Sequence, residues 1–488
     1  MRETEVENSR DEAQDLMFDA RRDRAQMARR LNTEIVRRNE LEKQLERSFT
    51  RYKIADRISD FLHRIPLLPS IGKAAARLFK GKGPSAPKGK SDLVAAEAPS
   101  SSASTTSEFG INLAGHLNSE KGVGEGARAT LRSLRAAEIP CQLVNSPDGN
   151  STNIEKLDSE TSDENPYDFN LVHLNADVLP AFADRHRSRF WDRYNIGYWA
   201  WELPTIPPSW CDGFRYFDEI WVPSMYCLDA VSRSSPIPVV RIPHSIQQDV
   251  AFDPAFSRSQ YGIGPDTFVF LFFFDFHSLM ERKNPIGLIE AFRRAFTRQD
   301  DALLFIKCSR SSWDPSSMAR LTEASRGANV KLFDSVISRP ALNSLISTCG
   351  AYTSLHRSEG FGLTLTEAMN MGKPVIATAY SGNMDFMTPS NSYPVKYQLT
   401  TIERDHGPYM KGSEWADPDL DHATHLMRHV FTHRDEAAEV GRRAQLDVAG
   451  QLNPRTIGRV IRERLMRGNE EAKIRRTLST DRESNARA

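Results

Sequence analysis

The sequence lacks the features of a secreted, membrane-spanning or metal-binding protein. Only 5 of its 488 residues are cysteines, and Cys141, Cys211, Cys227, Cys308 and Cys349 are scattered without the paired spacing of a metal site. No stretch approaches the roughly 18 continuous apolar residues of a membrane span, and the first residues, MRETEVENSRDEAQDL, have no apolar core. We therefore expect reduced, mostly buried cysteines and a cytoplasmic protein.

An excess of charge of one sign is also absent. The 64 Lys and Arg residues balance 64 Asp and Glu residues, so the overall charge indicates no nucleic-acid partner. The length favours two or three folded units, because one domain usually has about 100 to 200 residues.

Residues 1–90 differ in composition from the rest of the chain. Residues 1–64 are highly charged, and their apolar side chains fall roughly on one helical face, which predicts a helix that needs a partner, as in a coiled-coil homo-oligomer. Residues 65–90, IPLLPSIGKAAARLFKGKGPSAPKGK, are apolar and then basic. This pattern fits either peripheral contact with an anionic membrane surface or a solvated tail. Residues 91–107, rich in Ser and Ala, are expected to form a flexible linker.

From Glu108 onward, short apolar runs alternate with helical stretches, which predicts parallel sheets covered by helices. Strands are expected at FGINLAGHL, QLVN, FNLVHL, YNIGYWAW, EIWVPS and VVRIPHS, and then at TFVFLFFFDF, ALLFIKC, NVKLFD, AYTSLH and PVIAT. The fold class is α/β, with two Rossmann-like, doubly wound domains at 108–245 and 246–450 that face each other across a cleft. A C-terminal helix and tail follow at 451–488. Ligands of such folds bind at the carboxyl ends of the strands.

One candidate ligand-binding stretch is KGVGEGAR (121–128), which follows the first expected strand and opens a helix. Gly122, Gly124 and Gly126 would let backbone N–H groups approach an anion at the helix N-terminus. A tight turn required only for packing explains the same glycines.

A second stretch, FDFHSLMERKNP (274–285), also follows a strand and places two cations at a strand-to-helix junction. Arg282 and Lys283 are well placed there to neutralise a diphosphate. Solvated surface charge is the alternative interpretation.

The third stretch, HRSEGFGLTLTEAMNMGKPVIAT (356–378), combines a loop, a helix start and two carboxylates. The amides of Gly360, Phe361 and Gly362 are expected to point towards a bound anion. Glu359 in the loop and Glu367 about one turn into the helix can each accept paired hydrogen bonds from vicinal hydroxyls. A ligand with a diol at each end and a diphosphate between them is a nucleotide-sugar.

The segment SEGFGLTLTEAMNMGKPVIAT resembles the signature of family 4 retaining glycosyltransferases, which have the two-Rossmann GT-B architecture; the resemblance covers about 108–450. It implies an N-terminal acceptor-side domain and a C-terminal domain that binds the nucleotide-sugar. It also implies that Glu359 contacts the hydroxyls of the donor sugar, Glu367 the ribose diol and Lys283 the donor diphosphate. The glycine stretch would lie on the donor side.

Other parts of the chain extend or weaken this resemblance. YSGNMDF (380–386) occupies the position of a loop that closes on the sugar, which implies donor contacts for Gly382 and Asn383. His356, three residues before the motif, is expected to touch the donor sugar. Where many relatives have an arginine, this chain has Ser278, and Arg282 is expected to supply the missing charge. IGYWAWELP (196–204) is similar to a subset of bacterial members that act on surface polysaccharide.

The sequence therefore predicts a retaining, metal-independent hexosyltransferase without a cofactor, with Glu359, Lys283 and Arg282 as its catalytic residues. It would move a sugar, with GDP-mannose the favoured donor, to a hydroxyl of a glycan or lipid-linked oligosaccharide in surface polysaccharide synthesis. The acidic stretch DPDLD (417–421) is interpreted as a solvated helix cap rather than a metal site. Two alternatives remain open, a scaffolding protein with an inactive site and a nucleotide-sugar epimerase.

A front-face reaction is the expected mechanism, in which an oxygen of the leaving diphosphate takes the proton of the acceptor hydroxyl. No general base is assigned. His116, His173 and His244, near expected strand ends, are interpreted as structural hydrogen-bonding residues.

Overall fold

The structure, a computed structural model, describes residues 108–186, 190 and 193–468. These described residues all belong to one structural unit. The expected N-terminal helix, basic segment and linker lie outside them. The coiled coil, the homo-oligomer and the membrane contact therefore stay predictions. None of the helices that are described combines the length and the apolar character needed to cross a membrane.

The first sheet is parallel throughout and has the order β2-β1-β3-β4-β5-β6. Its strands are β1 (Glu108–Gly115), β2 (Cys141–Asn145), β3 (Tyr167–His173), β4 (Tyr194–Tyr198), β5 (Glu219–Val222) and β6 (Val239–Arg241). Its helical segments are α4 (Gly122–Ala136), α5 (Leu179–Arg185), η2 (Pro208–Tyr216) and α6 (Met225–Ser232). We call this part the first lobe.

The second sheet is also parallel and has the order β12-β11-β10-β7-β8-β9. Its strands are β7 (Phe268–Phe273), β8 (Ala302–Cys308), β9 (Val330–Asp334), β10 (Ala351–Ser354), β11 (Val375–Thr378) and β12 (Tyr393–Val395). Every residue of β7 is buried, as expected for a central strand covered on both faces. We call this part the second lobe.

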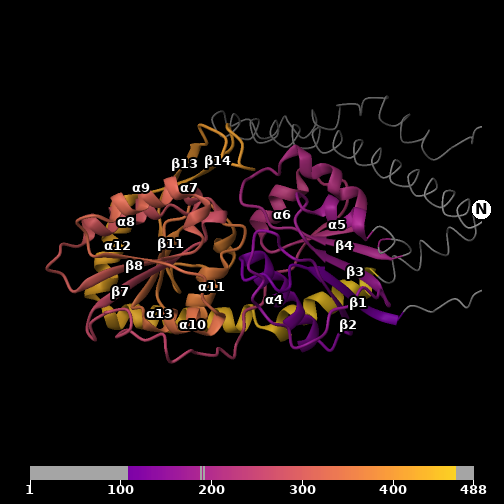
Figure 1. The fold of residues 1–488 in the computed structure, drawn as a ribbon, viewed down its shortest axis with the longest axis horizontal. Helices are drawn as coiled ribbons and strands as arrows, with labels where there is room; N and C mark the ends of the chain where they lie inside the picture. Colours follow the sequence, from indigo (N-terminus) through magenta and orange to yellow (C-terminus); the bar gives the residue numbers. More distant parts are fainter. Residues whose placement is uncertain (1–107, 187–189, 191–192, 469–488) are drawn as a thin grey trace, which may run out of the picture. The chain divides into compact units, whose positions relative to one another are not determined.

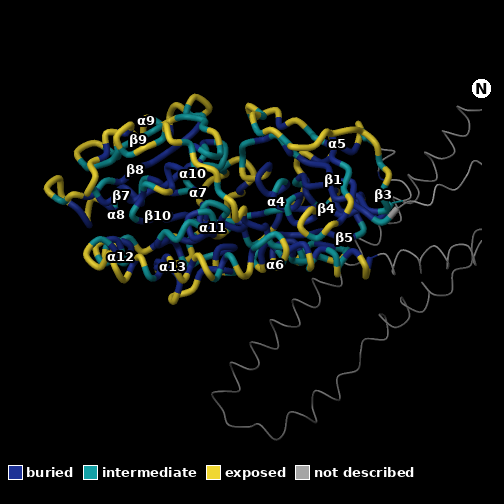
Figure 2. Tube along the Cα trace, turned by 90° about the horizontal axis from the view of Figure 1, so that it is seen from below, coloured by how far each residue is buried: buried dark blue, intermediate teal, exposed yellow. Residues whose placement is uncertain are grey.

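Helices flank the second sheet, and Figure 2 shows the strands buried between them while exposed residues lie on the outer loops and helices. The helical segments of the second lobe are η3 (Phe276–Ser278), α7 (Met280–Lys283), α8 (Pro285–Ala295), η4 (Ser311–Trp313), α9 (Pro315–Ser325), α10 (Arg339–Thr348), α11 (Leu363–Asn370), η5 (Gly382–Asp385), α12 (Leu420–Thr432) and α13 (Arg434–Gln451). Asp419 caps α12 by accepting a hydrogen bond from the His422 amide (2.9 Å), which confirms the cap expected in DPDLD. The strands and the α/β fold class predicted from the sequence are confirmed, and the fold is GT-B.

Two elements depart from the simple two-domain division. The antiparallel hairpin of β13 (Tyr397–Thr401) and β14 (Glu414–Pro418) is inserted between β12 and α12, and Figure 1 shows it outside both parallel sheets. Residues 454–468 form a helix that returns to the first lobe. There, Arg464 Nε donates to Glu219 (2.9 Å), and a Cβ on Gly458 would lie 2.3 Å from the Ser133 carbonyl oxygen. The part of 451–488 that is described, expected to be a C-terminal helix, thus packs on the first lobe.

Each sheet has a topological switch point, where the strand order reverses and the loops diverge. It lies between β1 and β3 in the first lobe and between β7 and β10 in the second. Doubly wound sheets bind ligands in the crevice outside the carboxyl ends of these strands. The loops after β7 and β10 contain the second and third stretches identified in the sequence.

Candidate active site

The β7/β10 switch point brings Lys283 and Glu359 together although 76 residues separate them in the chain. Lys283 Nζ donates to Glu359 Oε1 at 2.5 Å, and Arg282 Nη1 lies 3.4 Å from the same oxygen. All three side chains line one cavity. Two motifs that are far apart in sequence therefore form a single charged cluster.

Asn284 fixes the loop that carries Lys283, through its left-handed backbone conformation and its side-chain hydrogen bonds. Asn284 adopts a left-handed conformation (φ 53°), and its side chain accepts from the Gly287 amide at 3.2 Å, which caps α8. The same side chain donates to the Leu355 carbonyl at the end of β10 (2.9 Å). Asn284 thus ties the Lys283 loop to the loop that contains Glu359.

The Glu359 loop depends on glycines that no other residue can replace without strain. Gly362 has φ 99°, in the left-handed region, and directly precedes α11. The Gly382 amide donates to the Glu359 carbonyl (2.9 Å), and a Cβ on Gly382 would lie 2.2 Å from the Gly360 carbonyl oxygen. Gly360, Phe361 and Gly362 line the cavity, whereas Gly382 supports the loop from behind.

His356 and Asn383 also lie behind the loop instead of in the cavity. His356 is fully buried, and its ring nitrogens lie 3.1 Å from Ser354 Oγ and 3.1 Å from Asn383 Oδ1. Asn383 is fully buried too, and its Nδ2 donates to the Thr378 carbonyl. The structure therefore does not bring His356, Gly382 or Asn383 to the cavity lining, and places them behind the Glu359 loop.

Burial and close charges set the ionisation of the cluster. Burial raises the pKa of Glu359, but Lys283 and Arg282 lower it by more, to about 2. Burial lowers the pKa of Lys283, against the opposing effect of Glu359. Burial alone would lower the pKa of Arg282, but Tyr409, Glu202 and Glu359 raise it overall. Glu359 is thus an ionised carboxylate whose partners are both cationic.

Glu367 lies in the same cavity but has a different partner. Arg339 Nη1 donates to Glu367 Oε1 at 2.6 Å, while Arg339 Nη2 lies 3.3 Å from Glu125 Oε2 of the first lobe. Burial raises the pKa of Glu367 despite Arg339, and Glu125 contributes in the same direction. The second motif carboxylate is therefore held by an arginine that it shares with the other lobe.

The glycine stretch behaves differently from its sequence interpretation. Gly122 lines the cavity, but Gly124 and Gly126 do not. A Cβ would lie 2.1 Å from the Ser119 carbonyl oxygen at Gly124, and 2.7 Å from His244 Cε1 at Gly126. These two glycines allow close packing of α4, which was the alternative interpretation of the motif.

Further cations line the cavity that sequence reasoning missed. Lys307 lies near the end of β8 and Arg310 follows it, and Arg310 (φ 62°) pairs with Asp275 and with Glu120 of the first lobe. Ser278 lines the cavity close to this pair, because its amide donates to the Asp275 carbonyl (2.9 Å). Ser278 and Arg310 thus both contact Asp275, although no sequence motif marks SRSSW as a binding loop.

Histidines of the first lobe face the cavity, unlike His356. His116, His173 and His244 line it, and the rings of His173 and Tyr198 stack with centroids 4.1 Å apart. His173 is 6% exposed, and its Nε2 has no hydrogen-bond partner among the described residues. A buried, unpaired nitrogen costs free energy unless a ligand pairs with it. His173 is thus a candidate ligand contact that the sequence did not distinguish from structural histidines.

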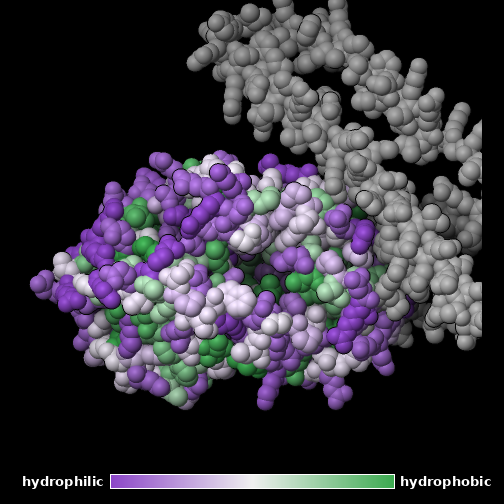
Figure 3. All heavy atoms as spheres, turned by 45° about the horizontal axis from the view of Figure 1, so that its top comes forward, coloured by the Kyte–Doolittle hydropathy of each residue, from purple (hydrophilic) through white to green (hydrophobic). Residues whose placement is uncertain are grey.

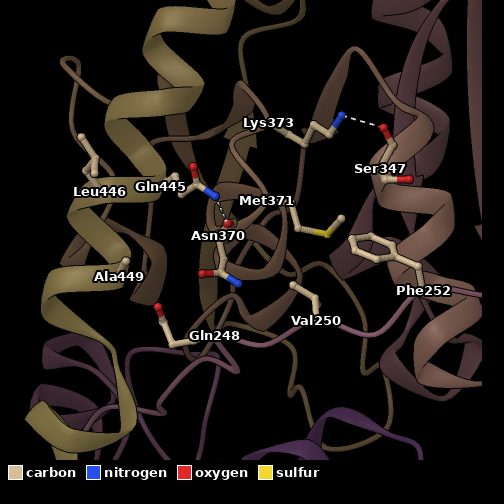
Figure 4. A pocket seen from close by; sticks show the side chains of 10 residues that line it. All are labelled: Gln248, Val250, Phe252, Ser347, Asn370, Met371, Lys373, Gln445, Leu446 and Ala449. Carbon is tan, nitrogen blue, oxygen red and sulfur yellow. Dashed lines mark hydrogen bonds between the residues drawn. The ribbon is translucent and has the colours of Figure 1, made fainter.

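The cavity has a volume of about 580 Å³ and is lined by both lobes; Figure 3 shows the surface hollowed near its centre. A second cavity of about 520 Å³ lies on the second lobe, and Figure 4 shows its lining. Its one charged side chain, Lys373, donates to the Ser347 and Cys349 carbonyls, so that amine is already engaged. Of these two cavities, the first is the one lined by several charged side chains, by the glycine motif and by the loops at the switch points.

Ranges 108–186 and 193–468, with residue 190, contain no cluster of three or more His, Cys, Asp or Glu side chains arranged to hold a metal ion. Cys227, Cys308 and Cys349 are buried, as expected, and none of the five cysteines forms a disulfide.

Residues 256–392 match the family described as Glycosyl transferases group 1. No curated protein sequence matches the chain. Sucrose-phosphate synthase from Thermosynechococcus elongatus is similar in structure, with a TM-score of 0.53 and 15% identity over 75% of this chain and 97% of that one. Anabaena HepE, solved in complex with UDP-glucose, has a TM-score of 0.53 and 14% identity over 74% of this chain and 100% of its own.

A glycosyltransferase from Rickettsia africae is similar as well, with a TM-score of 0.52 and 15% identity over 73% of this chain and 98% of its own. At such low identity these likenesses concern the fold, which they extend over both lobes. The family match, in contrast, lies on the second lobe and includes Lys283, Glu359 and Glu367. Residues 256–392 of this GT-B chain are therefore similar to a glycosyltransferase group 1 domain.

Proposed function

We propose that the protein is a retaining glycosyltransferase that moves a hexose from a nucleotide-sugar to a hydroxyl of a glycan or lipid-linked oligosaccharide. The observation that supports this most strongly is the Lys283–Glu359 pair at the β7/β10 switch point, beside the amides of Gly360 to Gly362. Cations and amides suit a diphosphate, and an ionised carboxylate suits sugar hydroxyls.

In this proposal, Lys283 and Arg282 stabilise the charge that develops on the leaving diphosphate. Glu359 accepts hydrogen bonds from hydroxyls of the transferred sugar, and Glu367 accepts them from the ribose. The unpaired Nε2 of His173 is positioned to contact the sugar from the first lobe. Transfer is front-face: the acceptor oxygen bonds to the anomeric carbon, the diphosphate leaves, and its oxygen takes the hydroxyl proton.

We propose further that the protein cations replace a metal ion in this role. Arg282, Lys283, Lys307, Arg310 and Arg339 line the cavity from the second lobe, and such groups can neutralise a diphosphate. The proposed location is the cytoplasm, with peripheral contact at the inner face of the membrane through residues 65–90, and the proposed pathway is surface polysaccharide synthesis.

GDP-mannose is the donor that we propose from the surface-polysaccharide likeness of IGYWAWELP, whereas UDP-glucose is the donor named in the HepE complex. Incubating the protein with GDP-mannose, UDP-glucose and other nucleotide-sugars tests both the activity and the donor. We expect release of the matching nucleoside diphosphate, dependent on Lys283 and accelerated by an acceptor. Conversion of the donor into its epimer without diphosphate release would contradict the proposal, and so would failure to bind any nucleoside diphosphate.

A further inference from the structure

The β13–β14 hairpin joins the second lobe in sequence but packs with the first. Its buried residues Ile402, Tyr409 and Trp415 belong to the same apolar cluster as Trp199 and other first-lobe aromatic residues. In Figure 1 the hairpin stands beside α7, at the edge of the second lobe that is nearer the first. It is therefore placed to combine groups of both lobes in one site.

The hairpin is fastened to the loop that carries the candidate catalytic carboxylate. The Ala416 amide donates to the Arg357 carbonyl (2.9 Å). The Arg357 guanidinium lies over the Trp415 ring, 5.6 Å from its centroid, and pairs with Asp417 at 3.0 Å. Since Arg357 is two residues before Glu359, the hairpin and the catalytic loop have a fixed relative position.

The hairpin tip reaches Glu202, which follows β4 in the first lobe. Tyr409 Oη donates to Glu202 Oε2 (3.1 Å), and the Tyr409 ring stacks on Trp201 with centroids 5.4 Å apart. The Glu202 carbonyl accepts from Tyr226 Oη (3.2 Å) and from Ser358 Oγ. Glu202 is thus held from both lobes.

One oxygen of Glu202 remains available to a ligand. Oε1 lies 3.7 Å from Arg282 Nη2, which is longer than a hydrogen bond, and the side chain is 23% exposed. Glu202 lines the cavity beside Trp201, Trp210 and Tyr409. Arg282 lies between Glu202 and Glu359, so the two carboxylates face the reaction site from opposite lobes.

We propose that Glu202 binds the acceptor hydroxyl, and that the hairpin, through Tyr409, sets its position. This inference rests on the proposed function. A carboxylate beside aromatic side chains fits a sugar, which presents hydroxyls at its edge and C–H groups on its faces. Before transfer, Glu202 accepts a hydrogen bond from the attacking hydroxyl and so orients its oxygen towards the anomeric carbon. As the diphosphate leaves, the same proton shifts from this hydrogen bond to the diphosphate oxygen. The bond between the anomeric carbon and the diphosphate breaks as the new glycosidic bond forms.

The location favours the acceptor over the donor. The cations proposed to hold the donor diphosphate belong to the second lobe, whereas Glu202 and its aromatic neighbours Trp201 and Trp210 belong to the first. The acidic side chain of Glu202 suits a neutral hydroxyl better than an anionic diphosphate.

The test compares Glu202→Gln and Tyr409→Phe with Glu403→Gln, the same acid-to-amide change at an exposed position of the hairpin insertion. Three quantities are measured on the full chain: affinity for the nucleoside diphosphate by calorimetry, donor hydrolysis without acceptor, and transfer to octyl glycosides. Binding of the octyl glycosides to the diphosphate-loaded protein is followed by saturation-transfer NMR.

We expect Glu202→Gln to lower kcat for transfer about thirtyfold or more, because a contact at the reacting atoms is lost. Diphosphate affinity and donor hydrolysis should stay within about twofold of the unchanged protein. Tyr409→Phe, which keeps the ring and removes one hydrogen bond, should raise the acceptor KM by about three- to tenfold. Glu403→Gln should change none of these quantities, and matching thermal midpoints will show that the variants are folded.

Four results would overturn the inference. Transfer by Glu202→Gln at the unchanged rate would remove Glu202 from the acceptor site. A parallel loss of hydrolysis and transfer would assign Glu202 to the donor sugar instead. If the unchanged protein binds a diphosphate but no octyl glycoside, the acceptor site is wrong while the proposed function stands. If it binds no nucleoside diphosphate at all, the proposed function fails and this inference with it.

Discussion

The two lobes line the same cavity with opposite charge. The first lobe contributes mainly carboxylates, namely Glu120, Glu125, Asp148, Glu155, Asp177 and Glu202. The second lobe contributes the cations Arg282, Lys283, Lys307, Arg310 and Arg339, together with Asp275 and the motif carboxylates. An anionic ligand is therefore favoured on the second lobe and a neutral, hydroxyl-rich ligand on the first.

This charge difference also couples the lobes. In each of three contacts across the cavity, a first-lobe acid pairs with a second-lobe arginine: Glu120 with Arg310, Glu125 with Arg339 and Glu202 with Arg282. In the proposed function, a bound diphosphate would compete with these acids for the arginines, and the ion pairs would form again when it leaves. The lobes thus hold each other through groups that the proposed donor would also use.

The largest expected effect tests whether the chemistry belongs to the second lobe. Glu359→Gln should lower kcat about a hundredfold, corresponding to about 3 kcal/mol, because Glu359 is proposed to contact the transferred sugar, where charge changes most in the transition state. Affinity for the nucleoside diphosphate alone, measured by calorimetry, should change little.

Asp417→Asn on the hairpin is not a suitable comparison, because Asp417 pairs with Arg357 close to the motif. Glu414→Gln, at an exposed position of β14, serves as the control. Weaker diphosphate binding by Glu359→Gln, with kcat unchanged, would exchange the roles of the two motif carboxylates.

A smaller effect is expected at Glu367, which connects to the first lobe through Arg339. Glu367→Ala should weaken binding of the donor and of the free nucleoside diphosphate alike, by about tenfold, because a carboxylate contact to a non-reacting ribose is lost. The kcat at saturating donor should change by less than about threefold.

The outcome also tests the coupling between the lobes. Glu125→Gln removes only the first-lobe contact of Arg339 and should reproduce part of the loss. If Glu125→Gln leaves diphosphate affinity unchanged while Glu367→Ala weakens it, the second lobe holds the ribose without help from the first.

A substitution in the glycine stretch of the first lobe should lower the stability of the fold, because these glycines allow close packing. Gly126→Ala places a Cβ 2.7 Å from His244 Cε1 and 3.1 Å from His173 Cε1, and such overpacking costs about 1–3 kcal/mol. Its midpoint of thermal unfolding should fall by several degrees relative to Gly149→Ala, since no atom lies within 4 Å of a Cβ at Gly149. Unchanged stability with lost diphosphate binding would restore Gly126 as a donor contact.

The motif carboxylates should respond to pH in opposite directions. The pKa of Glu359 is lowered from 4.5 to about 2, so its stabilising contribution is present above 4.5 and is lost as the pH falls through about 2. The pKa of Glu367 is raised, so its contribution is present at acid pH and is lost as the pH rises through the raised value.

Urea unfolding between pH 3 and 7 measures this difference. The destabilisation caused by Glu359→Gln should be larger at pH 7 than at pH 3. Glu367→Gln should instead become less destabilising, relative to the unchanged protein, as the pH rises. The same trend in both variants would show that the two carboxylates share one environment.

The sequence predicted those parts of the site that one continuous segment encodes. Glu359, Glu367 and the glycines between them lie on a single loop and helix, so their spacing alone places them together. The sequence also predicted the strands, because each buried strand appears in it as a short apolar run between helical stretches. Lys283 also belongs to one continuous segment, between the end of β7 and the start of α8.

What the sequence did not show depends on contacts between distant segments. His356 and Asn383 are adjacent to motif residues, yet backbone direction turns both away from the cavity, and they hydrogen-bond to each other. Arg310 and Glu202 are placed in the cavity by the packing of β8 and of the aromatic cluster, and no local pattern marks either residue. Sequence spacing identifies which loops meet, but not which side of a loop faces the ligand.

The smallest expected effect concerns metal ions, and it tests whether the cations of the second lobe are sufficient. Glu120 and Glu125 of the first lobe pair with arginines across the cavity, and Glu202 lies 3.7 Å from Arg282. Since Lys283 and its neighbouring arginines can neutralise the diphosphate, transfer and diphosphate release should persist in excess EDTA at an unchanged rate. The measurement is the initial rate of diphosphate release with EDTA, with EDTA followed by excess Mg²⁺ or Mn²⁺, and without either. Loss of activity in EDTA that the added metal restores would mean that first-lobe carboxylates leave their arginines to bind a cation when the donor enters, and the division of charge between the lobes would then serve metal binding.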